Sequence, residues 1–352
     1  MREQKSRRAP SLSGVGVGIA DALERGDFDG PLGRALSTQW ARIVERTLVR
    51  NLNLHGKLTV AIGGATLGGS GKTPVAIACA KALADMGARV ALIGHAYRAH
   101  PRCARAVMPT DALADVGDEA LVAARVLSGT SATVMVAPRR AEAVAFASRR
   151  SDVLVLDGVA QTAPDRASLA LLAVDAQEPW GRTHNVPPSG DLKAPVYALR
   201  SACDAVVAIT DGPSDRPSPW IAGSLEAHIE SRGVWLDDEL VPWNCLAGSH
   251  VGLVCALARP HRVVRFLEAR GLSVRAMVRA PDHGPFRPAR LLSTTFGLAD
   301  ADSLVDMWLA TPKCAVHVAA ARHRSPRPLA VIDYGVSLGL GALARLRRLG
   351  SP

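Results

Sequence analysis

Aromatic residues are scarce in this sequence, making up 4% of its 352 positions. Proteins that bind single-stranded nucleic acid usually stack the bases on aromatic side chains placed among basic ones. Few aromatic residues are interleaved with the basic runs here, so nucleic acid is not expected as a partner although the formal net charge is +10. The positive charge instead favours a phosphorylated small molecule or an anionic membrane surface.

Closely spaced cysteines and long apolar runs are also missing. The six cysteines form no CxxC pair, and only Cys314 has a histidine, His317, at a spacing that a metal could use. We interpret them as buried thiols in a reducing compartment. Since no run approaches the roughly 20 apolar residues that span a bilayer, and no signal peptide is recognisable, we expect a cytoplasmic protein. The sequence makes no prediction about the oligomeric state.

One segment, residues 31–50, has the pattern of a basic amphipathic helix. Its apolar face carries Leu36, Trp40, Ile43 and Thr47, and its basic face carries Arg34, Arg42, Arg46 and Arg50. Two interpretations stay open, a surface helix packed on its own domain or a helix that attaches to anionic lipid. Each Arg near such a leaflet contributes only about 1 kcal/mol, so the helix would support peripheral attachment without causing it alone.

Apolar runs alternate with helical stretches along most of the chain. Runs at 58–62, 89–93, 132–136, 152–156 and 169–174 are separated by Ala-rich stretches such as 117–127 and 139–149. This alternation predicts a parallel sheet covered on both faces. After a Pro-rich interruption from Pro179 to Pro195, the pattern resumes with strands at 204–209, 250–254 and 329–332 and a helix at 260–270. We therefore predict a first domain at 1–175, a smaller α/β domain at 176–335, and a C-terminal helix at 336–352 that can return to the first domain.

A glycine-rich loop follows the first apolar run and precedes a helix. Its residues are Gly68, Gly69, Ser70, Gly71, Lys72 and Thr73. In this context the backbone N–H groups surround phosphates, the lysine reaches the β- and γ-phosphates, and the Thr hydroxyl coordinates Mg²⁺. The usual pattern has glycine where this chain has Thr66. The loop predicts an ATP site in a P-loop NTPase-type doubly wound α/β fold.

Several short motifs occur in a defined order between residues 58 and 286. They are TLGGSGKTP, GDEA at 117–120, VLDGVAQ at 155–161, PPSGDLKAP at 187–195, ALARPHRVVRFLEARGL at 256–272 and PDHGPF at 281–286. As an ordered set they resemble the tetraacyldisaccharide 4'-kinase family of lipid A synthesis. The resemblance implies ATP- and Mg²⁺-dependent phosphorylation of the 4'-hydroxyl of an acylated glucosamine disaccharide 1-phosphate. It also implies peripheral attachment at the cytoplasmic face of the inner membrane.

The resemblance also assigns candidate catalytic residues. Asp118 and His283 match a family pair that lies near the acceptor hydroxyl, where a carboxylate can orient the imidazole and raise its basicity. Taken alone, Asp118 could instead be a helix N-cap and His283 a loop residue without a role. Asp157 closes an apolar strand and matches the first Asp of the family's DDGxQH motif, and Gln161 matches its glutamine. We therefore expect Asp157 and Gln161 to join Thr73 around the metal.

The chain departs from the family at the same motif. The second Asp is replaced by Gly158 and the His by Thr162, while the family's SRGYG and RDR become 94–98 and 138–140. These changes keep two alternatives open. One is a related P-loop enzyme with a different acceptor, and the other is a catalytically degenerate homologue that binds nucleotide or lipid without transferring phosphate.

Overall fold

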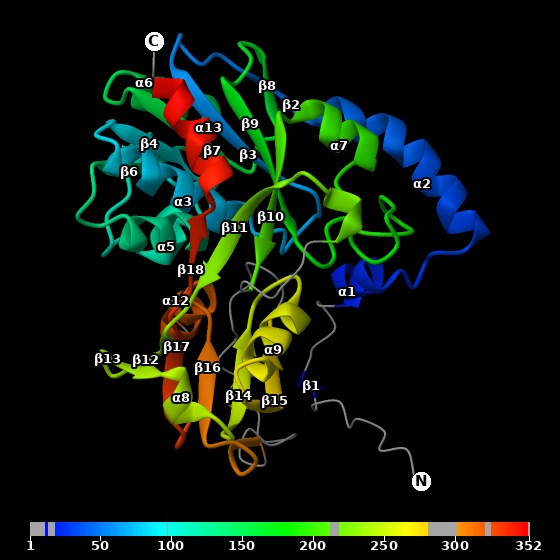
Figure 1. The fold of residues 1–352 in the computed structure, drawn as a ribbon, viewed down its shortest axis with the longest axis vertical. Coiled ribbons are helices and arrows are strands. Elements are labelled where there is room, and N and C mark those ends of the chain that lie inside the picture. The colour runs from blue at the N-terminus through cyan, green and yellow to red at the C-terminus, as the bar shows by residue number, and fades with distance from the viewer. Residues whose placement is uncertain are drawn as a thin grey trace. The chain divides into compact units, whose positions relative to one another are not determined.

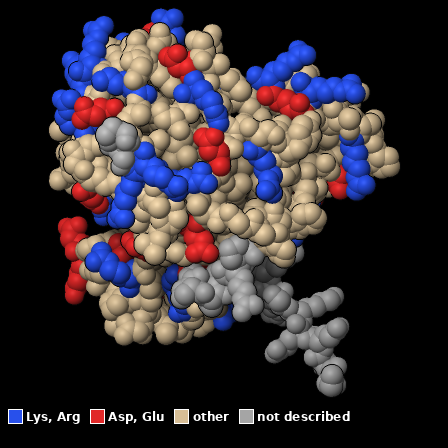
Figure 2. Space-filling model, turned by 45° about the horizontal axis from the view of Figure 1, so that its top comes forward, with Lys and Arg blue, Asp and Glu red and all other residues tan. Residues whose placement is uncertain are grey.

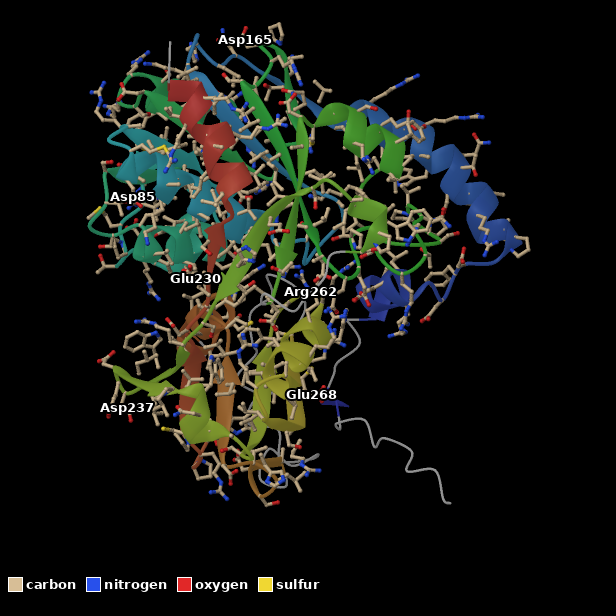
Figure 3. All side chains as sticks on the ribbon, viewed as in Figure 1. Asp85, Asp165, Glu230, Asp237, Arg262 and Glu268 are labelled. Atoms are coloured by element: carbon tan, nitrogen blue, oxygen red, sulfur yellow. The ribbon has the colours of Figure 1, made fainter. Side chains whose placement is uncertain are left out.

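The chain forms two compact units in the computed structural model, which describes residues 11–12, 18–96, 98–211, 218–280, 301–320 and 325–350. The P-loop unit contains Ile19–Glu230 and Gly335–Pro352, and the small unit contains Met1–Gly18 and Ser231–Tyr334. Figure 3 labels Glu230, the last residue of the first long segment of the P-loop unit. The predicted boundary near residue 176 is therefore wrong, because the chain stays in the P-loop unit through Glu230 and returns to it at Gly335.

The P-loop unit is built on a nine-stranded sheet. In spatial order the strands are β18 (Gly335–Leu338), β11 (Leu225–Glu230), β10 (Ala205–Thr210), β9 (Leu169–Asp175), β3 (Leu58–Gly64), β7 (Val153–Asp157), β4 (Val90–Ile93), β6 (Ala132–Val136) and β5 (Arg105–Ala106). All neighbours are parallel except the edge strands β18 and β5, which are antiparallel. The predicted strands of the first domain are confirmed, and β10 and β11 join them through parallel pairing with β9.

Helices cover both faces of this sheet, as its continuous apolar strands predict (Figure 1). One face carries α3 (Lys72–Asp85), α4 (Leu113–Val116), α5 (Asp118–Val126) and α13 (Leu340–Gly350), and the other α2 (Pro31–Val44), α6 (Arg140–Ser148) and α7 (Val196–Ala202). Buried Val144 of α6 meets Leu154 of β7, and Val44 of α2 clusters with Leu199 of α7 and Leu172 of β9. The C-terminal helix α13 contacts α3 within this unit.

The amphipathic segment is shorter than its sequence pattern predicts. Helix α1 (Gly18–Arg25) precedes α2, which ends at Val44, and a short 3₁₀ turn covers Glu45–Thr47. Val49–Leu52 then forms β2, which pairs in parallel with β8 (Gln161–Pro164). Arg50 therefore lies on a strand, and its predicted place on the helix is wrong. The helical periodicity could not reveal β2 because the partner strand lies more than a hundred residues away.

The small unit has a seven-stranded sheet of its own. In spatial order its strands are β1 (Ser11–Leu12), β15 (Ser273–Arg279), β14 (His250–Cys255), β16 (Met307–Ala310), β17 (Leu329–Ile332), β12 (Gly233–Leu236) and β13 (Glu239–Pro242). The first five run parallel, and β12 and β13 add an antiparallel edge. Among its described residues, the small unit has the helices α8 (Trp243–Leu246), α9 (Pro260–Glu268) and α12 (Pro312–Ala320), while the 3₁₀ turn Pro219–Ile221 belongs to the P-loop unit. The prediction of a second, smaller α/β unit is thus confirmed, but its main segment begins at Ser231 and not near residue 176.

Basic side chains outnumber acidic ones on one face of the molecule (Figure 2). Blue Lys and Arg side chains are more abundant than red acidic ones on the face drawn in Figure 2, and tan side chains separate them. This distribution agrees with the formal net charge of +10. The basic side chains on this face are dispersed (Figure 2), so surface charge alone does not mark a binding site.

Candidate active site

The glycine-rich loop lies at the carboxyl end of β3 and leads into α3, as predicted. Gly71 is the residue before the helix and has a φ of 79°, which favours glycine. A Cβ at this position would stand 2.2 Å from Ile209 Cδ1. The loop is therefore closed tightly against β10. Helix α3 begins at Lys72, so the N–H groups of its first turn, which have no acceptor within the helix, can bind a phosphate.

Thr66 has a structural role where the usual loop pattern has glycine. Its buried hydroxyl donates a hydrogen bond to the Gly68 carbonyl at 2.7 Å. Its backbone forms an antiparallel bridge with Leu192. On either side of this bridge, Lys193 N–H donates to the Ala65 carbonyl and Leu67 N–H donates to the Asp191 carbonyl, both at 2.8 Å. The loop is thus held by its own threonine and by a segment distant in sequence.

Thr73 and Asp157 meet beside this loop. β3 and β7 are parallel neighbours, and Ile62 is in register with Asp157, so the carboxylate stands next to the end of β3. The Thr73 hydroxyl donates a hydrogen bond to Asp157 Oδ2 at 2.7 Å. The other oxygen, Asp157 Oδ1, is buried and has no hydrogen-bond partner among the described residues. A buried carboxylate oxygen left open next to a Thr hydroxyl suits a hard cation such as Mg²⁺.

The protonation of Asp157 depends on its surroundings. Burial raises the pKa of its carboxyl, and the Lys72 ammonium opposes this by favouring the charged form. Within the described part of the chain, no group of three or more His, Cys, Asp and Glu side chains is arranged to hold a metal ion. A magnesium ion here would therefore take its remaining ligands from phosphate oxygens and water, which is how proteins commonly bind Mg²⁺.

The first turn of α5 carries two carboxylates, one of which, Glu119, contacts Lys72. Glu119 is largely buried, and its Oε1 lies 3.5 Å from Lys72 Nζ. Asp118 is buried and accepts a hydrogen bond from the Glu119 N–H at 2.7 Å. Gly117 occupies the N-cap position, so Asp118 is the first helical residue and not the cap considered from sequence. Both carboxylates are favoured there by the positive end of the helix dipole.

Two partly buried cations, Arg140 and Lys193, also lie at the site, and neither was predicted as a site residue. Arg140 begins α6 and is partly exposed, but its Nη2 atom is buried and has no hydrogen-bond partner among the described residues. Burial lowers the pKa of Lys193 from 10.5 to about 8, with the Lys72 charge as the next cause. The sequence signal for Lys193 was its motif, PPSGDLKAP, in which the lysine stands among apolar and turn residues. Arg140 was noted only as part of a departure from the family pattern.

Gly158 lies beside Lys72 and Arg140 and leaves room for a Cβ there. A Cβ there would meet Lys72 Cε at 3.5 Å and Arg140 Nη2 at 3.8 Å, both ordinary contacts. Its φ of 77° lies in the left-handed region, which Asp and Asn tolerate better than other residues with side chains. A small side chain at this position would therefore fit beside Lys72 and Arg140.

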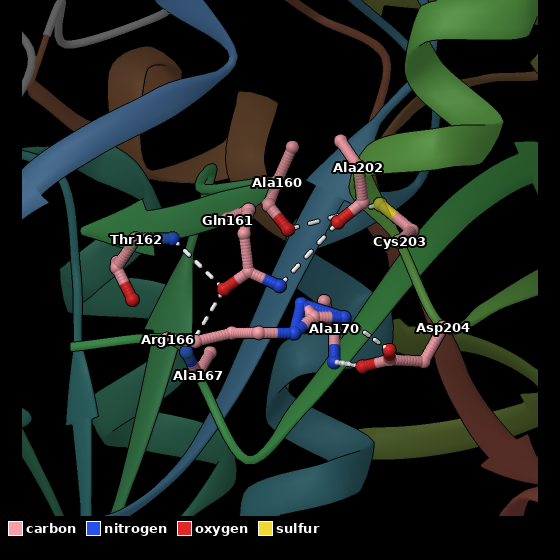
Figure 4. A network of polar contacts seen from close by, with 9 residues as sticks. All are labelled: Ala160, Gln161, Thr162, Arg166, Ala167, Ala170, Ala202, Cys203 and Asp204. Carbon is pink, nitrogen blue, oxygen red and sulfur yellow. Dashed lines mark hydrogen bonds and ion pairs between the residues drawn. The ribbon is translucent and has the colours of Figure 1, made fainter. Parts of the chain in front are cut away.

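Gln161 has a structural role in place of the predicted metal contact. Its Oε1 accepts hydrogen bonds from the N–H groups of Thr162 and Ala167 at 2.9 and 2.8 Å. Its Nε2 donates to the Ala202 carbonyl at 3.4 Å, which ties β8 to the end of α7 (Figure 4). Because both ends of the carboxamide serve the backbone, we do not retain Gln161 as a metal ligand.

His283 lies outside the described residues, as does Tyr97 of the 94–98 motif. The pairing of Asp118 with His283 therefore stays a prediction. Thr162, at the place of the family histidine, is buried and donates a hydrogen bond to the Asp165 carbonyl at 2.7 Å. Figure 3 labels Asp165, whose carboxylate accepts the Leu54 N–H at 2.8 Å. Thr162 thus stabilises a turn.

The fold and the loop define a nucleotide-binding protein of the doubly wound P-loop class. Comparison with known proteins then gives the family. The model of the tetraacyldisaccharide-1-P 4'-kinase family, LpxK, matches residues 34–347, and the chain therefore belongs to this family.

Individual relatives agree with this assignment. The tetraacyldisaccharide 4'-kinase of Anaeromyxobacter sp. (strain K) is 36% identical over 292 residues, which cover 76% of this chain and 74% of the relative. That of Anaeromyxobacter sp. (strain Fw109-5) is 32% identical over 308 residues, which cover 82% and 81%. The crystal structure of LpxK from Aquifex aeolicus in complex with ATP is similar in fold, with a TM-score of 0.61 and 17% identity. That similarity covers 90% of this chain and 99% of that chain.

Proposed function

We propose that the protein transfers the γ-phosphoryl group of ATP to the 4'-hydroxyl of a tetraacyl glucosamine disaccharide 1-phosphate in lipid A synthesis. The observation that carries the proposal is the meeting of Lys72, Thr73 and Asp157 at the carboxyl ends of β3 and β7. This edge of a doubly wound sheet is where ligands bind. Membership of the kinase family supplies the acceptor and the product.

Each charged group has a role suited to phosphoryl transfer. Lys72 neutralises the β- and γ-phosphates once it leaves Glu119, and Arg140 and Lys193 provide further positive charge for the phosphoryl oxygens. Thr73 and Asp157 would hold Mg²⁺, which when bound neutralises charge between the phosphates. Because the three cations are partly buried, water screens them less than it screens charges on the surface, which strengthens their attraction for phosphate.

The acceptor hydroxyl must lose a proton as it attacks. We propose that Asp118 and His283 act together as the base, with Asp118 orienting the imidazole. The burial of Asp118 at the first turn of α5, beside the Lys72 partner Glu119, supports this assignment for the carboxylate. Base assistance of this kind is typically worth about 10²- to 10⁴-fold in rate.

Purified protein, γ-labelled ATP and the disaccharide 1-phosphate in mixed detergent micelles test the proposal. We expect label at the 4' position, dependent on Mg²⁺, and none with Lys72→Ala. Lys81→Ala, which removes an exposed lysine from the same helix, is the matched control and should transfer normally. Nucleotide binding without any transfer would instead identify a degenerate homologue.

The exposed face of α2 supports peripheral attachment to a membrane. Leu32, Leu36, Trp40 and Ile43, spaced to share one face, are between 44% and 74% exposed, whereas the helix is held to its unit by Ser37 and Val44. The predicted apolar face is therefore not packed on the described residues of its own domain. No helix in the described segments is long and apolar enough to cross a membrane.

We propose that this face docks on the anionic lipid of the inner membrane, at its cytoplasmic side. Exposed Arg42 and Arg46 lie on or just after the same helix, and their charge complements acidic headgroups. Replacing both with Gln should weaken recovery with phosphatidylglycerol vesicles and reduce the salt sensitivity of the remainder. The control replaces exposed Arg102 and Arg149 instead. Equal losses in the two double variants would show that only net charge matters.

A further inference from the structure

Residues 183–193, here called the bridging segment, connect the exposed helix α2 to the P-loop. At the α2 end, the Ser37 hydroxyl donates a hydrogen bond to the Val186 carbonyl at 2.8 Å. The same hydroxyl accepts one from the Ser189 N–H at 3.0 Å. Ser37 and Ser189 are buried, so these two bonds are shielded from water. Leu36, next to Ser37 in the helix, is exposed on the apolar face.

The other end of the bridging segment is bonded along the P-loop backbone. Leu192 forms the antiparallel bridge with Thr66, flanked by the two 2.8 Å hydrogen bonds that join Asp191 and Lys193 to the loop. The Leu192 N–H also donates to the Asn185 carbonyl at 3.0 Å, which closes the segment on itself. The bridging segment is therefore hydrogen-bonded to α2 at one end and to the P-loop backbone at the other.

We propose that the bridging segment couples docking of α2 on a lipid surface to nucleotide binding, with Ser37 as the positioning residue. This proposal rests on the proposed attachment of α2 to the membrane. Lipid contacts at Leu36 and Trp40 restrict the helix turn that carries Ser37, and so fix the segment that holds the P-loop and carries Lys193. Nucleotide is then bound most tightly where the lipid acceptor is present.

Such coupling is reciprocal, because two binding equilibria linked through one protein change each other by the same factor. Vesicles should lower the Kd of nucleotide, and nucleotide should lower the apparent Kd of vesicles equally. Energetic couplings of this kind commonly amount to about 5- to 150-fold. Since the α2 end of the link consists of two hydrogen bonds, we expect a value near the lower limit, about 5-fold.

The test measures the Kd of the β,γ-imido analogue of ATP, with Mg²⁺, in the presence and absence of vesicles of equal parts phosphatidylglycerol and phosphatidylcholine. In the wild type we expect the Kd to fall about 5-fold with vesicles. In Ser37→Ala the ratio should approach one, while vesicle binding persists because the apolar face is intact. Thr38→Ala is the matched control, since the exposed Thr38 hydroxyl donates only within α2, to the Arg34 carbonyl at 2.9 Å.

The outcomes separate the two proposals. If the wild type does not bind vesicles, both the proposed attachment and the proposed coupling are refuted. Vesicle binding without any change in nucleotide Kd, or a Ser37→Ala ratio equal to that of the wild type, refutes the coupling alone. If Ser37→Ala does not fold, hydrogen exchange in the wild type replaces it. Vesicles should then slow exchange of the Ser189 and Lys193 amides, and unchanged exchange at both would contradict the coupling.

Discussion

Replacing Lys193 with Met should stabilise the protein without nucleotide and weaken its binding of ATP. Burial is the largest cause that lowers the pKa of this lysine from 10.5 to about 8. Because one pKa unit corresponds to about 1.36 kcal/mol, holding the buried ammonium charged at neutral pH costs roughly 3 kcal/mol of folding free energy. Met keeps a long apolar side chain and removes the charge, so this cost disappears.

The stability difference between Lys193→Met and the wild type should depend on pH. Below about pH 8 the ammonium is charged in the folded and the unfolded protein, and the full cost is present. Between about pH 8 and 10.5 the folded protein loses the proton first, so the wild type gains stability relative to the variant as the pH rises. Above that range the lysine is neutral in both states and the difference vanishes.

Urea unfolding at pH 7 and pH 10 measures this difference directly. We expect the free energy of unfolding of Lys193→Met to exceed that of the wild type by up to about 3 kcal/mol at pH 7 and by less at pH 10. Lys81→Met, at an exposed position of α3, should leave stability nearly unchanged. The affinity for the imido analogue should fall in Lys193→Met only. A Lys193→Met protein less stable than the wild type at pH 7 would refute the reasoning.

Three further predictions concern the site. Asp157→Asn keeps an acceptor for the Thr73 hydroxyl but loses the charge, so transfer should need about 10-fold more Mg²⁺; an unchanged Mg²⁺ titration would exclude Asp157 as a ligand. Gln161→Ala should lower the free energy of unfolding by about 2–3 kcal/mol, since it leaves buried backbone groups unpaired, with no change in the Mg²⁺ titration. The double variant Asp118→Ala with His283→Ala should lose little more activity than the worse single variant, whereas losses that multiply would end the paired-base hypothesis.

Most of the P-loop sheet was predictable because its central strands are buried on both faces and read as continuous apolar runs. The boundary between the two units was not predictable in the same way. Pro179–Pro195 has the composition of a linker, yet in the structure this stretch contains residues that bond to the P-loop and to α2. Composition records that the stretch is rich in turns and says nothing about where those turns pack. The chain continues through β10 and β11 before it leaves the unit.

The site was predictable where chemistry is encoded in consecutive residues. The loop residues through Thr73 and the strand-end Asp157 follow from local order, and the structure brings them together. Gln161 could not be assigned correctly because its partners include the backbone of Ala202, some forty residues away. Lys193 and Arg140 were missed for the same reason, since burial next to the loop is a property of the tertiary structure.

The measurement that most directly tests the account is single-turnover transfer from γ-labelled ATP to the tetraacyldisaccharide 1-phosphate, with enzyme in excess over nucleotide. The account predicts that the label moves to the 4' oxygen of the lipid, that chelation of Mg²⁺ stops the transfer, and that Lys72→Ala gives none. ATP bound at the site with no label reaching the lipid, or label appearing only as free phosphate, would contradict the central claim that this P-loop unit is a lipid kinase.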